Sequence, residues 1–154
     1  MRQRESFSGY ALAKGHSASY AFESYQSLYV KGNYHLEYMV AVINNFGGFY
    51  STEFYVHEAR KLGGIVEAPC VQQGDYPTVI HGTTIYLGFI LLNGLDETIG
   101  VTIGRERQEG GSFSSLTDFI DRVHIGIEQL TLLIRIGAFR FTGIAKQTLL
   151  WEAH

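Results

Sequence analysis

The stretch FSGYALAKGHSASYAFESYQ, residues Phe7–Gln26, places a lysine and a histidine directly before a tyrosine-rich helix. Ser17 is a suitable N-cap residue, so the first amide N–H groups of that helix would face Lys14 and His16. A helix N-terminus carries about half a positive charge and binds phosphate through its free donors. The stretch therefore predicts an anion site. Its candidate residues, including two flanking tyrosines that could hold a base, are Lys14, His16, Ser17, Tyr10 and Tyr20.

Apolar residues recur at helical spacing in three segments of the first 63 residues, which predicts helices over 17–31, 36–44 and 51–63. The second segment is apolar nearly all round and should be deeply buried. The third should start at Ser51 or Thr52 and stop at Gly63. Tyrosines at helical spacing usually pack in a core, which is the expectation for Tyr25, Tyr29, Tyr34 and Tyr38.

The pattern changes between Ile65 and Phe89, where β-branched residues, glycines and the two prolines of the chain indicate strands. The pieces TVI and TIYLGF flank His81-Gly82-Thr83, which predicts a tight hairpin. The sequence thus predicts a mainly α fold with a small β hairpin or sheet, an α+β class. Its parts are helices over 1–63, a short β element over 64–92 and paired helical hairpins over 93–154.

The C-terminal part contains a helical segment, ETIGVTIGRERQEG, with two glycines in its interior. Each costs about 1 kcal/mol relative to alanine, so packing against a neighbour has to compensate for Gly100 and Gly104. Further on, a stripe of apolar residues leads to Gly137 and is expected to be core. We therefore expect two helical hairpins between residues 93 and 143.

Three stretches resemble the C-family replicative DNA polymerases of bacteria, the DNA polymerase III alpha subunits. The first is Phe7–Ala21, similar to the fingers motif FxGYxFxKSHSxAYA, with Leu12 and Gly15 as departures. The second, SYQSLYVKGNYHLEYMVAVINN, looks like SYQxxxLKxxYPxEFMAAxL with His35 at the proline. The third is Gly137-Ala-Phe139, similar to the closing helix-hairpin-helix signature, although Arg140 replaces an aspartate.

The resemblance implies that the two hairpins are tandem helix-hairpin-helix motifs. In the family the first hairpin turn is Gly-apolar-Gly, whose backbone amides can approach a DNA phosphate closely because glycine has no side chain. The matching residues are Gly94, Leu95 and Asp96, so the second glycine is replaced by a carboxylate. Arg105 and Arg107 are further candidates for DNA contact, and the alternative is a solvated helix face paired with glutamates 106 and 109.

The resemblance also implies the function: a fragment of a DNA-directed DNA polymerase, a nucleotidyltransferase, that clamps the phosphates of an incoming deoxynucleotide and contacts primer-template DNA. The family's palm carboxylates, which bind two Mg²⁺ ions, have no counterpart here, because the aspartates are scattered singly. We therefore expect no bound metal in this segment and no polymerase activity from it alone. The sliding clamp and other replisome subunits are further expected partners.

Composition favours a packed domain, with 45% hydrophobic and 14% aromatic residues. The formal net charge of -3 excludes a strongly basic, autonomous nucleic-acid binder. The single Cys70 is expected to be buried, and the chain, without a signal peptide or a long apolar run, is expected to be cytoplasmic, with no membrane partner. Two alternatives remain: a non-catalytic interaction or DNA-binding module on the same scaffold, and a small hydrolase that uses His16.

Overall fold

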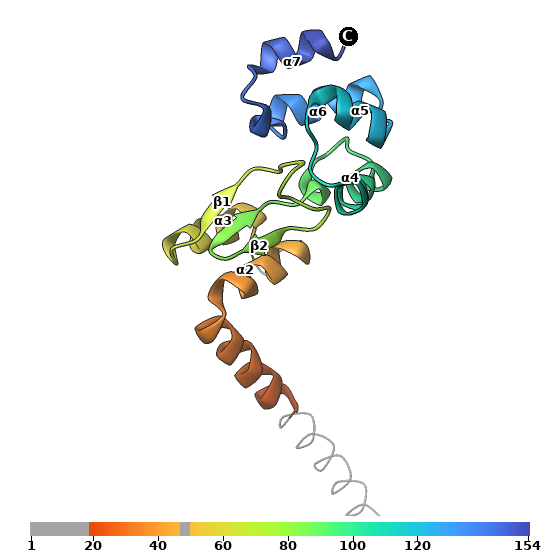
Figure 1. Ribbon diagram of the computed structural model, residues 1–154. Helices are drawn as coiled ribbons and strands as arrows, with labels where there is room; N and C mark the ends of the chain where they lie inside the picture. The colour runs from red at the N-terminus through yellow and green to blue at the C-terminus, as the bar shows by residue number, and fades with distance from the viewer. Residues whose placement is uncertain (1–18, 47–49) are drawn as a thin grey trace, which may run out of the picture.

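The computed structural model describes residues 19–46 and 50–154 and divides them between two neighbouring hydrophobic cores (Figure 1). The first core packs helices α2 (His35–Asn44) and α3 (Thr52–Lys61) against a small sheet. Its buried residues are Leu36, Met39, Val40, Ala59 and Ile85. Helices α2 and α3 confirm two of the predicted helices, and the Ser51 side chain accepts a hydrogen bond from the Phe54 amide, as expected of an N-cap.

The sheet has three short strands, β1 (Ile65–Glu67), β2 (Val79–His81) and β3 (Thr84–Tyr86), in the order β1-β3-β2. Strands β2 and β3 form the predicted antiparallel hairpin, and Gly82 in its turn has a φ of 62°. Strand β1 pairs with β3 in parallel, which the sequence analysis did not predict. The predicted strand TIYLGF ends at Tyr86, because Phe89–Leu91 turn into a 3-10 helix, η1.

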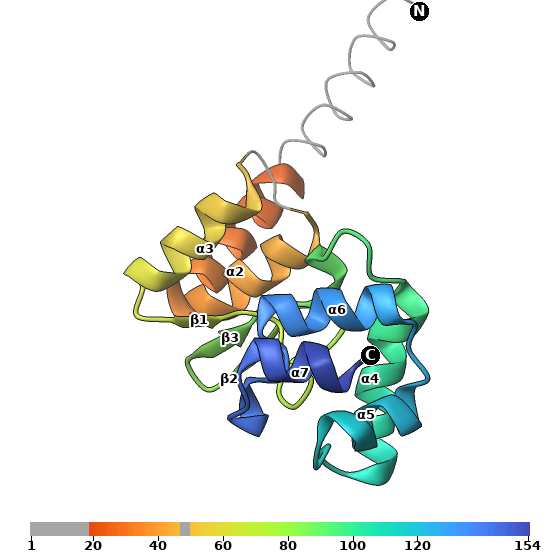
Figure 2. The ribbon, with the colours of Figure 1, turned by 90° about the horizontal axis from the view of Figure 1, so that it is seen from above.

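The second core joins the C-terminal helices α4 (Glu97–Gly110), α5 (Leu116–Val123), α6 (Ile127–Ile136) and α7 (Lys146–Glu152), with a 3-10 turn, η2 (Arg140–Thr142), before α7. Figure 2 shows α7 beside α6, and the two helices are in contact. Phe119 is fully buried at the centre, with its ring between those of Phe113 and Phe139. Together with the small sheet, these helices confirm the predicted α+β class.

The two glycines inside α4 are explained by close packing against the loop before the sheet hairpin. A Cβ at Gly100 would lie 2.5 Å from a ring carbon of Tyr76, and one at Gly104 would lie 2.6 Å from an Asp75 carboxylate oxygen. Ordinary Cβ contacts are much longer, so any larger residue would push the helix away. The expected compensation by packing is therefore confirmed, and Cys70 is buried as predicted.

The first helical segment, residues 19–33, confirms the predicted helix, but the expected burial of its tyrosines is not found. Every residue from 19 to 34 is exposed, and the segment projects from the body of the molecule (Figure 1). The prediction of core packing is therefore wrong for Tyr25, Tyr29 and Tyr34, which are 54% to 68% exposed. Only Tyr38, one turn into α2, packs partly buried against the first core. Helical spacing gave these rings a common face, but the described chain provides nothing that covers it.

Asn44 connects α2 to β2 and gives a first testable prediction. Its side chain accepts a hydrogen bond from the Thr78 amide at 2.7 Å and donates one to the Thr78 carbonyl at 2.8 Å. Since Thr78 is almost fully buried, Asn44→Ala leaves two backbone groups without partners and should lower the free energy of unfolding by about 2 kcal/mol. Urea denaturation followed by circular dichroism measures this loss.

The neighbouring Asn45 provides the control, because its side chain is exposed and, among the described residues, donates to the Ala41 carbonyl of the preceding helical turn. Asn45→Ala should change stability by less than about 0.5 kcal/mol. Equal effects of the two substitutions would show that the bond pair to Thr78 does not hold the helix to the strand.

Candidate functional site

The predicted anion site falls mainly outside the described residues. Tyr10, Lys14, His16 and Ser17 precede residue 19, where the description of the structure starts. Of the five predicted residues, only Tyr20 is described; it lies on the first helical segment and is 66% exposed. The structure thus places one predicted nucleotide-site residue on an exposed helix and leaves the anion site itself a prediction.

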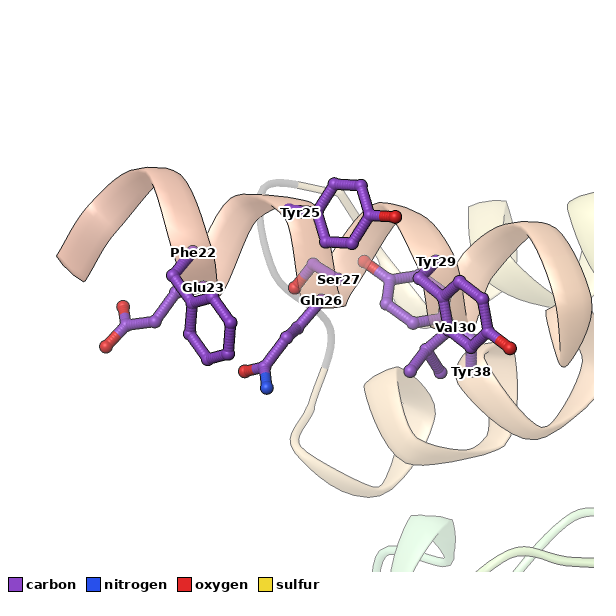
Figure 3. Close-up of a pocket in the computed structure, with 8 residues that line it drawn as sticks. All are labelled: Phe22, Glu23, Tyr25, Gln26, Ser27, Tyr29, Val30 and Tyr38. Carbon is purple, nitrogen blue, oxygen red and sulfur yellow. The ribbon is translucent and has the colours of Figure 1, made fainter. Parts of the chain in front are cut away.

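The same helical segment borders a groove of about 790 Å³. Figure 3 shows that its lining side chains come from the helical segment 19–33 and from α2. Tyr29, Val30 and Tyr38 lie together at one end of the groove, and Phe22 and Glu23 lie at the other. The remaining lining residues are Tyr25, Gln26 and Ser27. Aromatic rings on an exposed surface can stack on nucleic-acid bases. Such stacking is independent of the base sequence, because every base has a π-face. The groove therefore has the chemistry of a stacking surface, and its lining residues follow the predicted anion site in the sequence.

The C-terminal part contains two turns of the same form, each leading into a helix. In the first, Gly94 has a φ of 94°, Leu95 packs against the second core, and Asp96 is the N-cap of α4. Only a residue without Cβ adopts that φ easily, which explains the glycine. Gly94 and Leu95 thus lie in a turn between η1 and α4, and their contact with DNA stays a prediction.

The second turn, between α5 and α6, repeats this order with other residues. His124 has a φ of 53°, Ile125 packs against the same core, and Gly126 is the N-cap of α6. The sequence analysis did not single out this turn. Its signal was present as an apolar residue followed by glycine between two helical segments, but a histidine occupies the left-handed position where a glycine is usual.

The two turns are joined by a pair of hydrogen bonds that sequence reasoning also missed. Gln129, in the first turn of α6, accepts a bond from the Asp96 amide at 3.0 Å through Oε1 and donates one to the Asp96 carboxylate at 2.7 Å through Nε2. We call this contact the Asp96–Gln129 clasp. It brings the starts of α4 and α6 together and occupies both the amide and the carboxylate of Asp96.

The predicted DNA contacts Arg105 and Arg107 differ in their surroundings. Arg105 is exposed and pairs with the adjacent Glu106 at 3.3 Å. The Arg107 side chain is only 16% exposed; it donates to the carbonyls of Val71 and Gly74 and pairs with Asp75 at 2.8 Å. Its partner is therefore Asp75 rather than glutamate 106 or 109. The geometry assigns Arg107 to the fold and leaves Arg105 as the more accessible candidate.

Two further arginines are also bound within the fold. Arg122 donates to the carbonyls of Glu106 and Gly111, lies over the Phe113 ring and approaches the carboxylate of Asp118. Arg140, at the position where the family has aspartate, donates to the carbonyls of Ala68 and Pro69 and lies 3.6 Å from Glu67. These contacts connect the hairpins to each other and to the sheet, so neither side chain is available as an open phosphate ligand.

Asp118 has a lowered pKa, chiefly because its carboxylate accepts a hydrogen bond from the Ser114 amide. The Ser115 hydroxyl in turn accepts from the Asp118 amide, so these residues cap the start of α5. Since the folded state lowers this pKa, the contribution of the cap is present above the ordinary carboxyl range and is lost as the pH falls through the lowered value.

Within residues 19–46 and 50–154, no cluster of three or more His, Cys, Asp or Glu side chains is arranged to hold a metal ion. In the same part of the chain, no helix has the length and apolar character needed to cross a bilayer.

A family model described as a helix-hairpin-helix motif matches residues 63–149, which include both turns and the clasp. Similar proteins include the DNA polymerase III subunit alpha of Saccharopolyspora erythraea, which is 31% identical over 147 residues. That of Thermus aquaticus is 32% identical over 138 residues, and the error-prone DNA polymerase of Bdellovibrio bacteriovorus is 30% identical over 153.

These three alignments cover 93%, 87% and 96% of this chain but only 12%, 11% and 14% of the respective relatives. The chain thus spans roughly an eighth of the length of the relatives that it matches. The similarity confirms the resemblance to bacterial replicative polymerases that the three motifs indicated.

Proposed function

Because the chain belongs to the helix-hairpin-helix family and is similar along nearly all its length to DNA polymerase III alpha subunits, we propose that it is the fingers and hairpin segment of a template-directed DNA polymerase. The observation that supports this most is the alignment over 93% of the chain to one continuous part of a much longer polymerase. The fold adds support, since the Gly94 turn leads into α4 and a second turn of similar form joins α5 to α6.

In this proposal the N-terminal motif holds the triphosphate of an incoming deoxynucleotide. Lys14 and His16 precede Ser17 in the sequence, and in this proposal they would supply positive charge beside N–H donors of a helix that Ser17 would cap. Phosphoryl transfer needs such positioning and charge neutralisation more than covalent help from the protein. Tyr10 and Tyr20 would hold the base or the template by stacking.

The remaining requirements would come from other parts of the polymerase. Mg²⁺ held by residues outside this segment would supply charge neutralisation for the transferred phosphate. No group of ligands for it occurs among the described residues, so we propose that this segment alone does not catalyse synthesis. A sliding clamp and other replisome subunits, in the cytoplasm, belong to the same proposal.

We predict that Lys14→Ala combined with His16→Ala lowers the affinity for a fluorescent deoxynucleoside triphosphate about tenfold, or 1.4 kcal/mol. The affinity for primer-template DNA at low salt should change by less than about twofold, because the hairpins are untouched. Fluorescence anisotropy with both ligands measures the two effects on the same protein.

The matched control is Lys31→Ala combined with His57→Ala, which removes one exposed lysine and one exposed histidine elsewhere on the chain. It should bind the triphosphate like the wild type. The proposal fails if the two double variants bind triphosphate equally well, or if the folded wild type binds neither triphosphate nor DNA.

The second candidate function is a non-catalytic interaction module on the same scaffold. It is favoured by the exposed aromatic face of residues 19–34 and by a hairpin turn that carries Asp96 in place of glycine. In that case the triphosphate and DNA assays above would both be negative while the chain stays folded.

A further inference from the structure

The first hairpin turn has the backbone geometry to receive a phosphate, but its Asp96 amide is already bound to Gln129 and the residue carries a carboxylate. Glycine at the left-handed position and a helix starting directly afterwards are the features that let backbone amides approach an anion. Here the Asp96 amide already donates to Gln129, and the Asp96 carboxylate lies at the same place. The turn therefore keeps its shape and has lost an open donor.

The charged side chains around the first hairpin turn also disfavour a phosphate there. Besides Asp96, the first turns of α4 and α6 carry Glu97 and Glu128, and both of these side chains are exposed. Among the described residues, none of these three carboxylates forms an ion pair, whereas arginines 107, 122 and 140 are bound within the fold. A phosphate at this surface would meet like charge instead of a cation, which costs binding energy.

We propose that the Asp96–Gln129 clasp closes the first hairpin turn of this chain to a DNA phosphate, making Asp96 the residue that sets the DNA affinity of the hairpin region. This inference rests on the proposed function, in which the hairpins contact DNA. It deepens that function by assigning the first turn a closed state in which Gln129 takes the place of the phosphate as the partner of the turn amide.

The test compares short duplex DNA binding by the wild type and by Asp96→Gly at several salt concentrations. The substitution removes the Cβ, the carboxylate and the bond that Gln129 Nε2 donates to it, so that Gln129 is left with only the backbone amide bond of the clasp. Glycine at an N-cap costs little stability. We expect affinity to rise about tenfold at low salt, and this gain to shrink as added salt screens the charge that the Asp96 carboxylate carried.

Two further variants separate the components of the effect. Glu97→Gln removes a neighbouring charge and leaves the clasp intact, while Gln129→Ala frees the turn amide and leaves the Asp96 carboxylate in place. Each should raise the affinity for DNA by less than about threefold, because the negative charge of Asp96 and the bond between the turn amide and Gln129 oppose phosphate binding together. Circular dichroism and thermal unfolding check that all variants are folded.

An unchanged DNA affinity in folded Asp96→Gly overturns the inference, as does a full gain in Glu97→Gln, which would show a general charge effect without the clasp. The triphosphate assay with the Lys14 and His16 variant is run in parallel. If the wild type binds triphosphate but Asp96→Gly gains no DNA affinity, the inference about the clasp is rejected and the proposed function is kept. If the wild type binds no triphosphate and Asp96→Gly gains no DNA affinity, both are rejected.

Discussion

Phe119→Ala is expected to lower the free energy of unfolding by about 4 kcal/mol, the largest effect of any substitution considered for this chain. The Phe119 ring is fully buried, and the rings of Phe113 and Phe139 lie edge-on to it with centroids 5.0 and 4.8 Å away. Removing it leaves a cavity walled by two stiff rings, which cannot collapse as flexible aliphatic side chains would. Urea denaturation followed by circular dichroism measures the loss.

The control for this prediction is Trp151→Ala, which removes another large aromatic side chain. Trp151 is 82% exposed on α7, so its loss should change stability by less than about 0.5 kcal/mol. A loss below about 2 kcal/mol for Phe119→Ala would mean that the hairpin core repacks freely. That result would argue against a rigid platform under the two hairpin turns.

Arg107→Ala is expected to lower the free energy of unfolding by about 3 kcal/mol. The guanidinium holds the loop before β2 against α4: it donates to the carbonyls of Val71 and Gly74 at 2.8 and 2.6 Å and pairs with Asp75. Truncation leaves those carbonyls and a half-buried carboxylate without a partner. Because Gly104 packs directly on Asp75, the close contact of the loop with the helix should loosen as well.

Arg105→Ala is the matched control, two residues away on the same helix and more than half exposed. It should leave stability within about 0.5 kcal/mol of the wild type. If Arg105 contacts DNA, this variant weakens binding and reduces the salt slope by about one, whereas Arg107→Ala weakens DNA binding only as far as it unfolds the protein. An Arg107→Ala variant as stable as the wild type would contradict the structural role.

The sequence anticipated features that depend on neighbouring residues. Ser51 and Gly63 bracket α3 because an N-cap and a left-handed C-terminal glycine act within one helical turn. The sheet hairpin around Gly82 followed from its turn residues, and the glycines inside α4 correctly indicated close packing from another element. The resemblance to polymerases rests on such local motifs too, and the alignments confirm it.

The features that were missed depend on contacts between distant residues. Hydrophobic periodicity and composition could not show that β1 pairs in parallel with β3. Nor could they show that Arg107 donates to a loop more than thirty residues away, or that Gln129 contacts Asp96. Tyr25, Tyr29 and Tyr34 were expected in a core for the same reason. Their spacing gives them one face, but only the packing of other elements decides whether that face is covered.

By itself, therefore, the sequence determined helix α3, the hairpin turn of the sheet and the family, since each follows from capping, backbone conformation or a contiguous motif. The tertiary structure alone decided which charged groups are open to a ligand. An arginine or a turn amide looks the same in a sequence whether it faces solvent or a buried carbonyl, and its availability depends on partners that only folding brings within hydrogen-bond distance.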